Sequence, residues 1–187
     1  GRGGEEALAC RRAGVPVSLV PGVTSALAVP AYAGIPVTHR GLSADVHIIT
    51  SAAGSEGSGA DWAAAARAGT LVILMGLGTL ERDMAKLVEL GKSPATPAAC
   101  ISSGTRPDQR VVRGTVATIP LLVAEAGLRS PAITLVGDVA TLADELAWDR
   151  PGRLAGRSVV VTRASHQAST LCEMLHAEGA NVLEVPV

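Results

Sequence analysis

The residue types that most often hold metals or carry redox chemistry are few in this chain and widely spaced. They are His39, His47, His166, His176, Cys10, Cys100 and Cys172. The histidines show neither the H-E-x-x-H pattern nor another metal-ligand spacing, so we expect no metal site. The cysteines form no C-x-x-C pair and no plausible disulfide framework, which fits a reducing, cytoplasmic compartment.

Two short segments offer groups that can bind a ligand through the backbone or a hydroxyl. Thr24 follows Pro21-Gly22 and can cap the next helix by accepting a backbone N–H in its first turn. Gly76-Leu-Gly78 follows the most apolar predicted strand, but it lacks the third glycine of G-x-G-x-x-G. No acidic residue is placed convincingly for a ribose either, so a dinucleotide-dependent oxidoreductase is disfavoured.

Charge and hydrophobicity are balanced along the chain. The formal net charge is −1, which predicts no broad attraction to nucleic acid or to an anionic membrane, so any anionic ligand must be held by local arginines. The hydrophobic fraction of 48% is enough to bury a core. No apolar run approaches the roughly 20 residues of a membrane span.

Helical and strand patterns alternate, which predicts an α/β fold with a sheet flanked by helices. The predicted strands cover residues 15–20, 45–50, 70–75, 98–102, 110–116 and 132–136. The predicted helices cover residues 5–13, 24–34, a short stretch around Trp62, the stretch between Gly78 and Gly91, 118–126 and 139–146. Pro30 should kink or break its helix, and Gly34 and Gly91 should end theirs. Residues 103–109 form a hairpin-like loop, and residues 51–59 a Ser/Gly loop.

Composition shifts near the end of the chain and divides it. Residues 1–147 form the first unit, and residues 148–157, rich in arginine and glycine, are expected to be a linker. Residues 158–187 show a new β-α-β pattern, with strands at 158–162 and 182–185 around a helix at 167–178. The first six residues have no initiator Met and no signal-peptide pattern, so we expect an internal piece of a longer protein.

An ordered set of motifs resembles the tetrapyrrole methylase family, and within it the uroporphyrinogen-III C-methyltransferase branch. The motifs are Gly1-Arg-Gly-Gly-Glu-Glu6, Val20-Pro-Gly-Val-Thr-Ser25, Ala33-Gly-Ile-Pro-Val-Thr-His-Arg40, Leu71-Val-Ile-Leu-Met-Gly76, Ser103-Gly104-Thr105 leading to Gln109, and Pro131-Ala-Ile-Thr-Leu-Val-Gly137. Each motif is weak alone, but their common order over residues 1–148 is specific.

The resemblance implies a two-domain α/β enzyme that acts as a homodimer and methylates uroporphyrinogen III to precorrin-2. That product leads to sirohaem and cobalamin. The methyl donor is S-adenosyl-L-methionine, bound between the domains, and no metal is needed. The family's N-terminal domain is missing here, so part of the cofactor site and some catalytic groups are expected outside this chain.

The resemblance also implies which residues bind the cofactor. Thr24 and Ser25 correspond to contacts for the methionine carboxylate, although Thr24 can equally be a helix cap alone. Met75 matches a position whose backbone meets the adenine edge; without the resemblance it would be a core residue. Gly76, Gly104 and Ala132 complete the expected contacts, and Gly104 is expected to be small because a side chain would collide with adenosine.

Substrate residues follow from the same resemblance. Uroporphyrinogen III carries eight carboxylates, and guanidinium groups pair bidentately with carboxylates. Arg2 and Arg40 are expected to hold these groups, and Arg2 is also our candidate catalytic residue. Glu5 is expected to orient Arg2 or accept a pyrrole N–H. For each of these residues, a solvated surface side chain remains the alternative.

Residues 154–186 resemble the start of a uroporphyrinogen-III synthase, although a generic βαβ unit would look similar. A synthase would produce the substrate of the methyltransferase, which favours a fusion of the two, with the isolated chain inactive. Arg163 could meet substrate carboxylates, but a solvated strand-end arginine is the stronger expectation. The alternatives are another precorrin methyltransferase and a non-catalytic α/β interaction domain.

Overall fold

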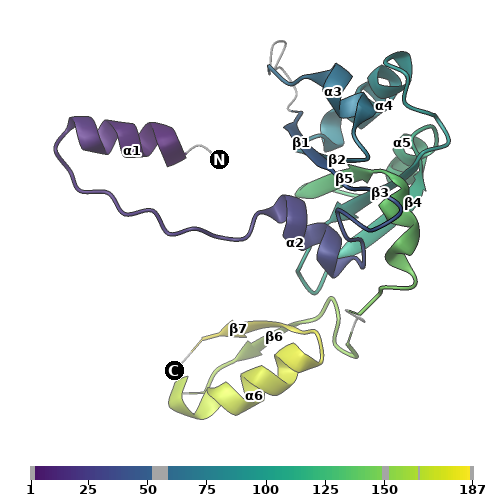
Figure 1. The fold of residues 1–187 in the computed structure, drawn as a ribbon. Helices are drawn as coiled ribbons and strands as arrows, with labels where there is room; N and C mark the ends of the chain where they lie inside the picture. The colour runs from purple at the N-terminus through teal and green to yellow at the C-terminus, as the bar shows by residue number, and fades with distance from the viewer. Residues whose placement is uncertain (1–2, 52–58, 149–151, 164, 186–187) are drawn as a thin grey trace.

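A mixed five-stranded sheet forms the centre of the structure (Figure 1). The computed structural model describes residues 3–51, 59–148, 152–163 and 165–185. The strands are β1 (Val46–Thr50), β2 (Thr70–Leu74), β3 (Pro97–Ser102), β4 (Arg110–Thr115) and β5 (Ala132–Val136), in the spatial order β1-β2-β5-β3-β4. β1 and β2 are parallel, whereas β5 runs antiparallel to both β2 and β3, and β4 runs antiparallel to β3. The predicted α/β class and the hairpin around residues 103–109 are confirmed.

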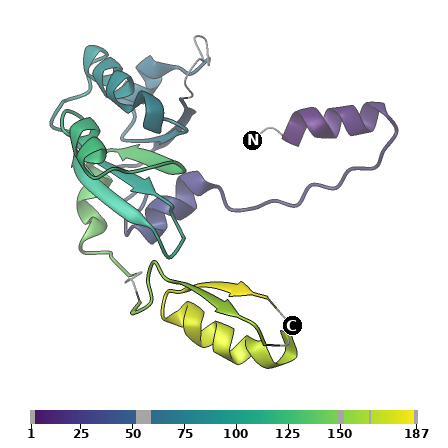
Figure 2. The same ribbon diagram turned by 180° about the vertical axis from the view of Figure 1, so that it is seen from behind.

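Helices cover both faces of this sheet (Figures 1 and 2). One face carries α3 (Trp62–Arg67), α4 (Leu80–Glu89) and α5 (Ile119–Glu125). The other carries α2 (Ser25–Tyr32) and the 3-10 helix η2 (Asp138–Ala143). A second 3-10 turn, η1 (Leu77–Thr79), joins β2 to α4.

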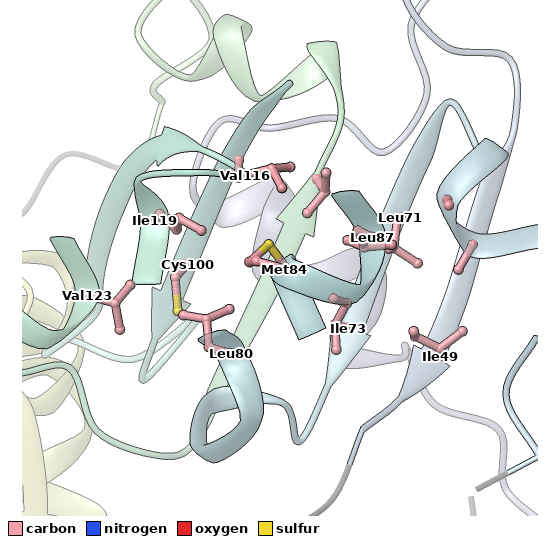
Figure 3. Close-up of a cluster of buried hydrophobic side chains, with 14 of the residues drawn as sticks. Ile49, Leu71, Ile73, Leu80, Met84, Leu87, Cys100, Val116, Ile119 and Val123 are labelled. Atoms are coloured by element: carbon pink, nitrogen blue, oxygen red, sulfur yellow. The ribbon is translucent and has the colours of Figure 1, made fainter. Parts of the chain in front are cut away.

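β2 illustrates how the two faces are filled. Leu71 and Ile73 point into the cluster beneath α3, α4 and α5, which Figure 3 shows, while Val72 between them points into the cluster beneath α2. Burial of each such side chain contributes about 1.5–3 kcal/mol. A strand buried on both faces has a continuous apolar run, which is why β2 was readily predicted.

α4 is amphipathic, and spacings of one, three and four residues would place Leu80, Met84, Leu87 and Val88 on one face. Leu80, Met84 and Leu87 are buried, but Val88 is 40% exposed. At 3.6 residues per turn, Val88 is rotated by about 80° from Leu80, which places it at the margin of the apolar stripe. Gly91 ends this helix with φ 96°, and Gly34 follows α2 with φ 71°, so both predicted stops are confirmed.

Two predicted elements are wrong. Residues 15–20 form no strand: among the described residues this segment has no ladder partner, and Leu19 and Val20 are 77% and 91% exposed. A strand requires hydrogen bonds to a neighbour, which an apolar pattern alone cannot supply. The segment links α1 (Gly3–Arg12), which has no buried residue, to α2, and Figures 1 and 2 show α1 set apart from the sheet.

The predicted closing helix at residues 139–146 is instead η2. Thr141 Oγ1 donates to the Asp138 carbonyl at 2.7 Å, which is a local alternative to regular α-helical bonding. Pro30 lies inside α2, which ends two residues later at Tyr32, in agreement with the predicted early break.

The last part of the chain forms the predicted β-α-β pattern. β6 (Ser158–Val161) and β7 (Asn181–Glu184) pair in parallel, and α6 (Ser165–Ala177) connects them. Val161 and Cys172 are the buried residues of a separate small cluster. Most of the predicted 51–59 loop and residues 149–151 of the predicted linker lie outside the described residues. None of the described helices has the length and apolar character needed to cross a bilayer.

Candidate functional site

The ends of three strands meet at one edge of the sheet. β2 and β3 run in the same direction on either side of β5, and Leu74 pairs with Ile133 while Ser102 pairs with Ala132. The residues that follow β2 and β3 therefore lie beside the start of β5. We call this the carboxyl edge and define it as Met75, Gly76, Ser103, Gly104 and Ala132.

Backbone strain is concentrated at the carboxyl edge. Among the described residues, the non-glycine residues with positive φ are Met75 (55°), Ser103 (51°) and Thr105 (67°). Such a conformation costs about 1–3 kcal/mol and persists where surrounding structure enforces it, often at ligand sites. Strain just beyond the ends of β2 and β3, which lie on either side of β5, marks this edge as the candidate site.

Met75 is a surface residue rather than a core residue. It directly follows β2, its backbone has a left-handed conformation, and the residue is 66% exposed. The reading of Met75 as a buried strand end is therefore wrong. The predicted contact between its backbone and a ligand stays a prediction.

Gly76 is buried beneath the turn that follows Met75. A Cβ atom at this position would lie 2.7 Å from Ile73 Cγ2 and 3.4 Å from Asp83 Oδ2. Glycine is required there because β2 and α4 approach the backbone closely. Its predicted role beside a ligand ring stays a prediction.

Gly104 is small for a reason that differs from the expected one. A Cβ atom there would lie 2.4 Å from Val29 Cγ1 and 2.5 Å from Val29 Cγ2. α2 thus packs Val29 directly against the loop after β3. Packing within the protein already accounts for glycine at this position, and a clash with adenosine is not needed to explain it.

The loop after β3 is fastened to α2 by Gln109. Its side-chain oxygen accepts from the Thr105 backbone N–H at 2.8 Å, and its amide nitrogen donates to the Tyr32 carbonyl at 3.4 Å. Ser103 N–H donates to the Pro131 carbonyl at 2.9 Å, which ties the same loop to the start of β5. These bonds hold both strained residues of the loop.

A buried polar network behind Met75 was not predicted. Asp83 is fully buried on α4 and accepts from Thr79 Oγ1 at 2.7 Å. Thr79 in turn contacts Ser51 Oγ at 3.1 Å, and Arg82 reaches both Ser51 and Asp83. The available signal was an acidic residue on the apolar face of α4, between Leu80 and Met84.

The remaining predicted cofactor residues lie at the start of α2. Thr24 and Ser25 are exposed, and Thr24 Oγ1 accepts from the Ala26 N–H at 3.3 Å. The predicted capping role of Thr24 is thereby confirmed. α2 reaches the carboxyl edge through Val29, four residues beyond Ser25.

Two of the predicted substrate residues, Arg40 and Glu5, are not brought to this edge. Arg40 lies in an exposed turn closed by the His39–Ser43 bridge, and Ser43 lies beside Gly69, at the beginning of β2 rather than at its end. Glu5 is exposed on α1, away from the sheet (Figure 1). Arg2 lies outside the described residues.

A family model for tetrapyrrole (corrin/porphyrin) methylases matches residues 1–120. The chain belongs to this family. A tetrapyrrole methylase from Methanosarcina barkeri, named S-adenosyl-L-methionine-dependent uroporphyrinogen III methyltransferase, is 50% identical over 155 residues, covering 81% of this chain and 61% of that protein. The chain thus spans about three fifths of this relative.

Two further matches extend the comparison with the methylase family. The porphyrin biosynthesis protein HemD of Ruminiclostridium josui is 39% identical over 188 residues, covering 100% of this chain and 37% of that protein. The crystal structure of a Thermus thermophilus uroporphyrin-III C-methyltransferase with S-adenosyl homocysteine superposes with a TM-score of 0.64 at 38% identity. It covers 76% of this chain and 62% of that one.

The carboxyl edge combines small residues with an exposed, left-handed turn. Gly104 and Ala132 are small and half-buried, and Met75 is 66% exposed. Ligands of α/β sheets commonly bind beyond the carboxyl ends of strands. Within the described ranges, no three His, Cys, Asp or Glu side chains gather as metal ligands.

Proposed function

We propose that this chain is part of an S-adenosylmethionine-dependent C-methyltransferase that converts uroporphyrinogen III to precorrin-2. The observation that carries the proposal is the strained, small-residue carboxyl edge in a tetrapyrrole methylase. The 50% identity to a protein named for this reaction supports the choice of substrate. S-adenosylmethionine supplies an electrophilic methyl group when bound.

Each cofactor residue has a distinct role in the proposal. The Met75 backbone hydrogen-bonds the adenine edge, while Gly76, Gly104 and Ala132 line the place of the nucleoside. Thr24 and Ser25 offer hydroxyl and N–H groups at the start of α2 to the methionine carboxylate. Catalysis then consists of positioning a nucleophilic ring carbon in line with the methyl group, excluding water and removing one proton.

The substrate residues act through charge. Arg2 and Arg40 pair with acetate and propionate groups of the macrocycle, and Glu5 orients Arg2 or accepts a pyrrole N–H. Arg40 and Glu5 lie away from the carboxyl edge in this chain, and the complete pocket is proposed to need further residues of a longer protein. The isolated 187-residue chain is accordingly proposed to be inactive.

The longer protein is proposed to be a cytoplasmic homodimer that carries a fused uroporphyrinogen-III synthase. Residues 1–147 belong to the methylase, 148–157 to the linker and 158–187 to the start of the synthase. The match of the whole chain to the porphyrin biosynthesis protein of R. josui supports this arrangement. The product serves sirohaem or cobalamin synthesis.

Calorimetric titration of the complete protein with S-adenosylhomocysteine tests the proposal. We expect saturable binding of this ligand, no response to a nicotinamide nucleotide, and methylation of uroporphyrinogen III. Binding without turnover of this substrate would instead favour another precorrin methyltransferase. Absence of binding would leave a non-catalytic domain as the function.

A further inference from the structure

We propose that Asp83 is a positioning residue, whose buried carboxylate holds the Met75 turn in the shape that receives adenosine. It acts through the hydroxyl of Thr79. This inference rests on the proposed function, because it assigns a role to the ligand that we place at the carboxyl edge.

The side chains of Ser51, Thr79, Asp83 and Arg82 form a closed ring of hydrogen bonds. A hydroxyl has a single proton, and the shortest contact of Thr79 Oγ1 is with Asp83 Oδ2 at 2.7 Å. Thr79 therefore donates to the carboxylate and accepts from Ser51 Oγ, 3.1 Å away. Arg82 Nη2 closes the ring by donating to Ser51 Oγ at 3.4 Å and to Asp83 Oδ1 at 3.2 Å.

The ring is attached to both sides of Met75. On the strand side, Ser51 N–H donates to the Leu74 carbonyl at 2.8 Å. On the helix side, Thr79 N–H donates to the Gly76 carbonyl at 3.2 Å, and Thr79 Oγ1 lies 3.3 Å from that same oxygen. The residues before and after the left-handed Met75 are thereby fixed to one rigid cluster.

Burial explains why this cluster should be rigid. The Asp83 side chain is 0% exposed, whereas that of Arg82 is 58% exposed. A buried carboxylate is costly unless its oxygens are paired, so any movement of Thr79 or Arg82 away from it is opposed. Hydrogen bonds to a charged acceptor are also about twice as strong as neutral ones.

Stability alone is a poor explanation for an acid at this position. Asp83 lies on the apolar stripe of α4 between Leu80 and Met84. Where a buried polar group serves stability alone, apolar groups in place of all its partners are often as stable, whereas removal of one partner alone is costly. What an apolar residue cannot do is hold Thr79, and through it the Gly76 carbonyl, in one orientation.

The test compares ligand affinity with stability in the complete protein. Asp83→Leu should weaken S-adenosylhomocysteine binding, measured by calorimetry, at least tenfold at a temperature at which the variant is folded by circular dichroism; its melting temperature should fall, because the buried Thr79 hydroxyl loses its acceptor. Glu81→Gln, at an exposed acid on the same helix, is the matched control and should leave both quantities unchanged.

Two changes at Thr79 guard against a folding defect in Asp83→Leu. Thr79→Val removes the hydroxyl at constant shape and should also weaken binding at least tenfold, whereas Thr79→Ser should restore it. Wild-type affinity in either Asp83→Leu or Thr79→Val would overturn the positioning role. If the wild-type protein itself fails to bind, the proposed function is wrong and this inference with it.

Discussion

At the scale of a single residue, packing explains why position 104 is glycine. Its φ does not lie in the left-handed region, so the backbone alone would accept alanine. The obstacle is Val29, which a new Cβ atom would approach to 2.4 Å. A smaller residue at position 29 would remove this contact. An effect of packing can then be told apart from an effect on ligand binding.

We therefore expect Gly104→Ala to lower the free energy of unfolding by about 1–3 kcal/mol, as overpacking does. The double variant Val29→Ala/Gly104→Ala should be more stable than the sum of the single effects predicts, by at least about 0.5 kcal/mol. Urea unfolding measures the stability of the single variants and of the double variant. Gly78→Ala, where a Cβ atom meets no neighbour within 4 Å, is the control. Strict additivity would contradict the assigned contact.

The pH dependence of stability tests whether the Cys100 thiol is buried. Burial raises the pKa of its thiol above the ordinary value, against a smaller lowering by its hydrogen bond with Thr134. The folded state therefore keeps a proton that the unfolded state releases, and stability falls as pH rises above the ordinary thiol pKa. Between about pH 8 and about pH 10, the free energy of unfolding should fall less steeply for Cys100→Ala than for the wild type. Equal slopes would show that Cys100 does not contribute.

Arg40 is the most accessible test of the substrate residues. In the complete protein, Arg40→Ala should raise KM for uroporphyrinogen III about tenfold or more, because a charge-assisted pairing with carboxylate is lost. Affinity for S-adenosylhomocysteine should stay within about twofold, since Arg40 lies away from the carboxyl edge. Arg67→Ala, at the exposed end of α3, serves as the control. Equal loss of both affinities would reject the assignment.

At the scale of elements, α2 is held at its last turn by two side chains from distant parts of the chain. Trp148 Nε1 donates to the Ala31 carbonyl at 2.9 Å, and Gln109 donates to the Tyr32 carbonyl. The Tyr32 and Trp148 rings also meet edge to face, with centroids 4.9 Å apart. A helix of 8 residues needs such partners, because short helices are marginal by themselves.

Trp148→Phe should consequently lower the free energy of unfolding by about 0.5–1.5 kcal/mol, the net contribution of one hydrogen bond. The aromatic ring stays, so the loss reports the indole N–H. Tyr32→Phe keeps the ring that meets Trp148 and should change stability little. Circular dichroism during urea unfolding measures both variants, and a Trp148→Phe protein as stable as the wild type would exclude this anchor.

At the scale of the whole molecule, the hydrophobic clusters of the five-stranded sheet are separate from the cluster of Val161 and Cys172. Separate cores predict separate unfolding. Removing residues 158–187 should shift the melting temperature of the sheet by no more than about 3 °C, since a change of 1 kcal/mol moves it by about 2–4 °C at this size. A fall of more than about 6 °C would instead indicate that the two parts stabilise each other.

Local patterns in the sequence determined most of the elements. The apolar run of β2, the stripe of α4 and the capping hydroxyl of Thr24 depend on neighbours in sequence, so their structure could be predicted. The order of motifs likewise indicated the family. The 15–20 segment failed because a strand needs a partner strand, and periodicity says nothing about whether one is present.

Only the tertiary structure decided how the candidate site is assembled. Sheet order brings Met75, Gly104 and Ala132 to one edge although more than fifty residues separate the first from the last. It also showed that Val29 explains Gly104 and that Asp83 is paired beneath the Met75 turn. Contacts of this kind join side chains that are remote in sequence, and their energies depend on distance and burial, which residue order alone does not contain.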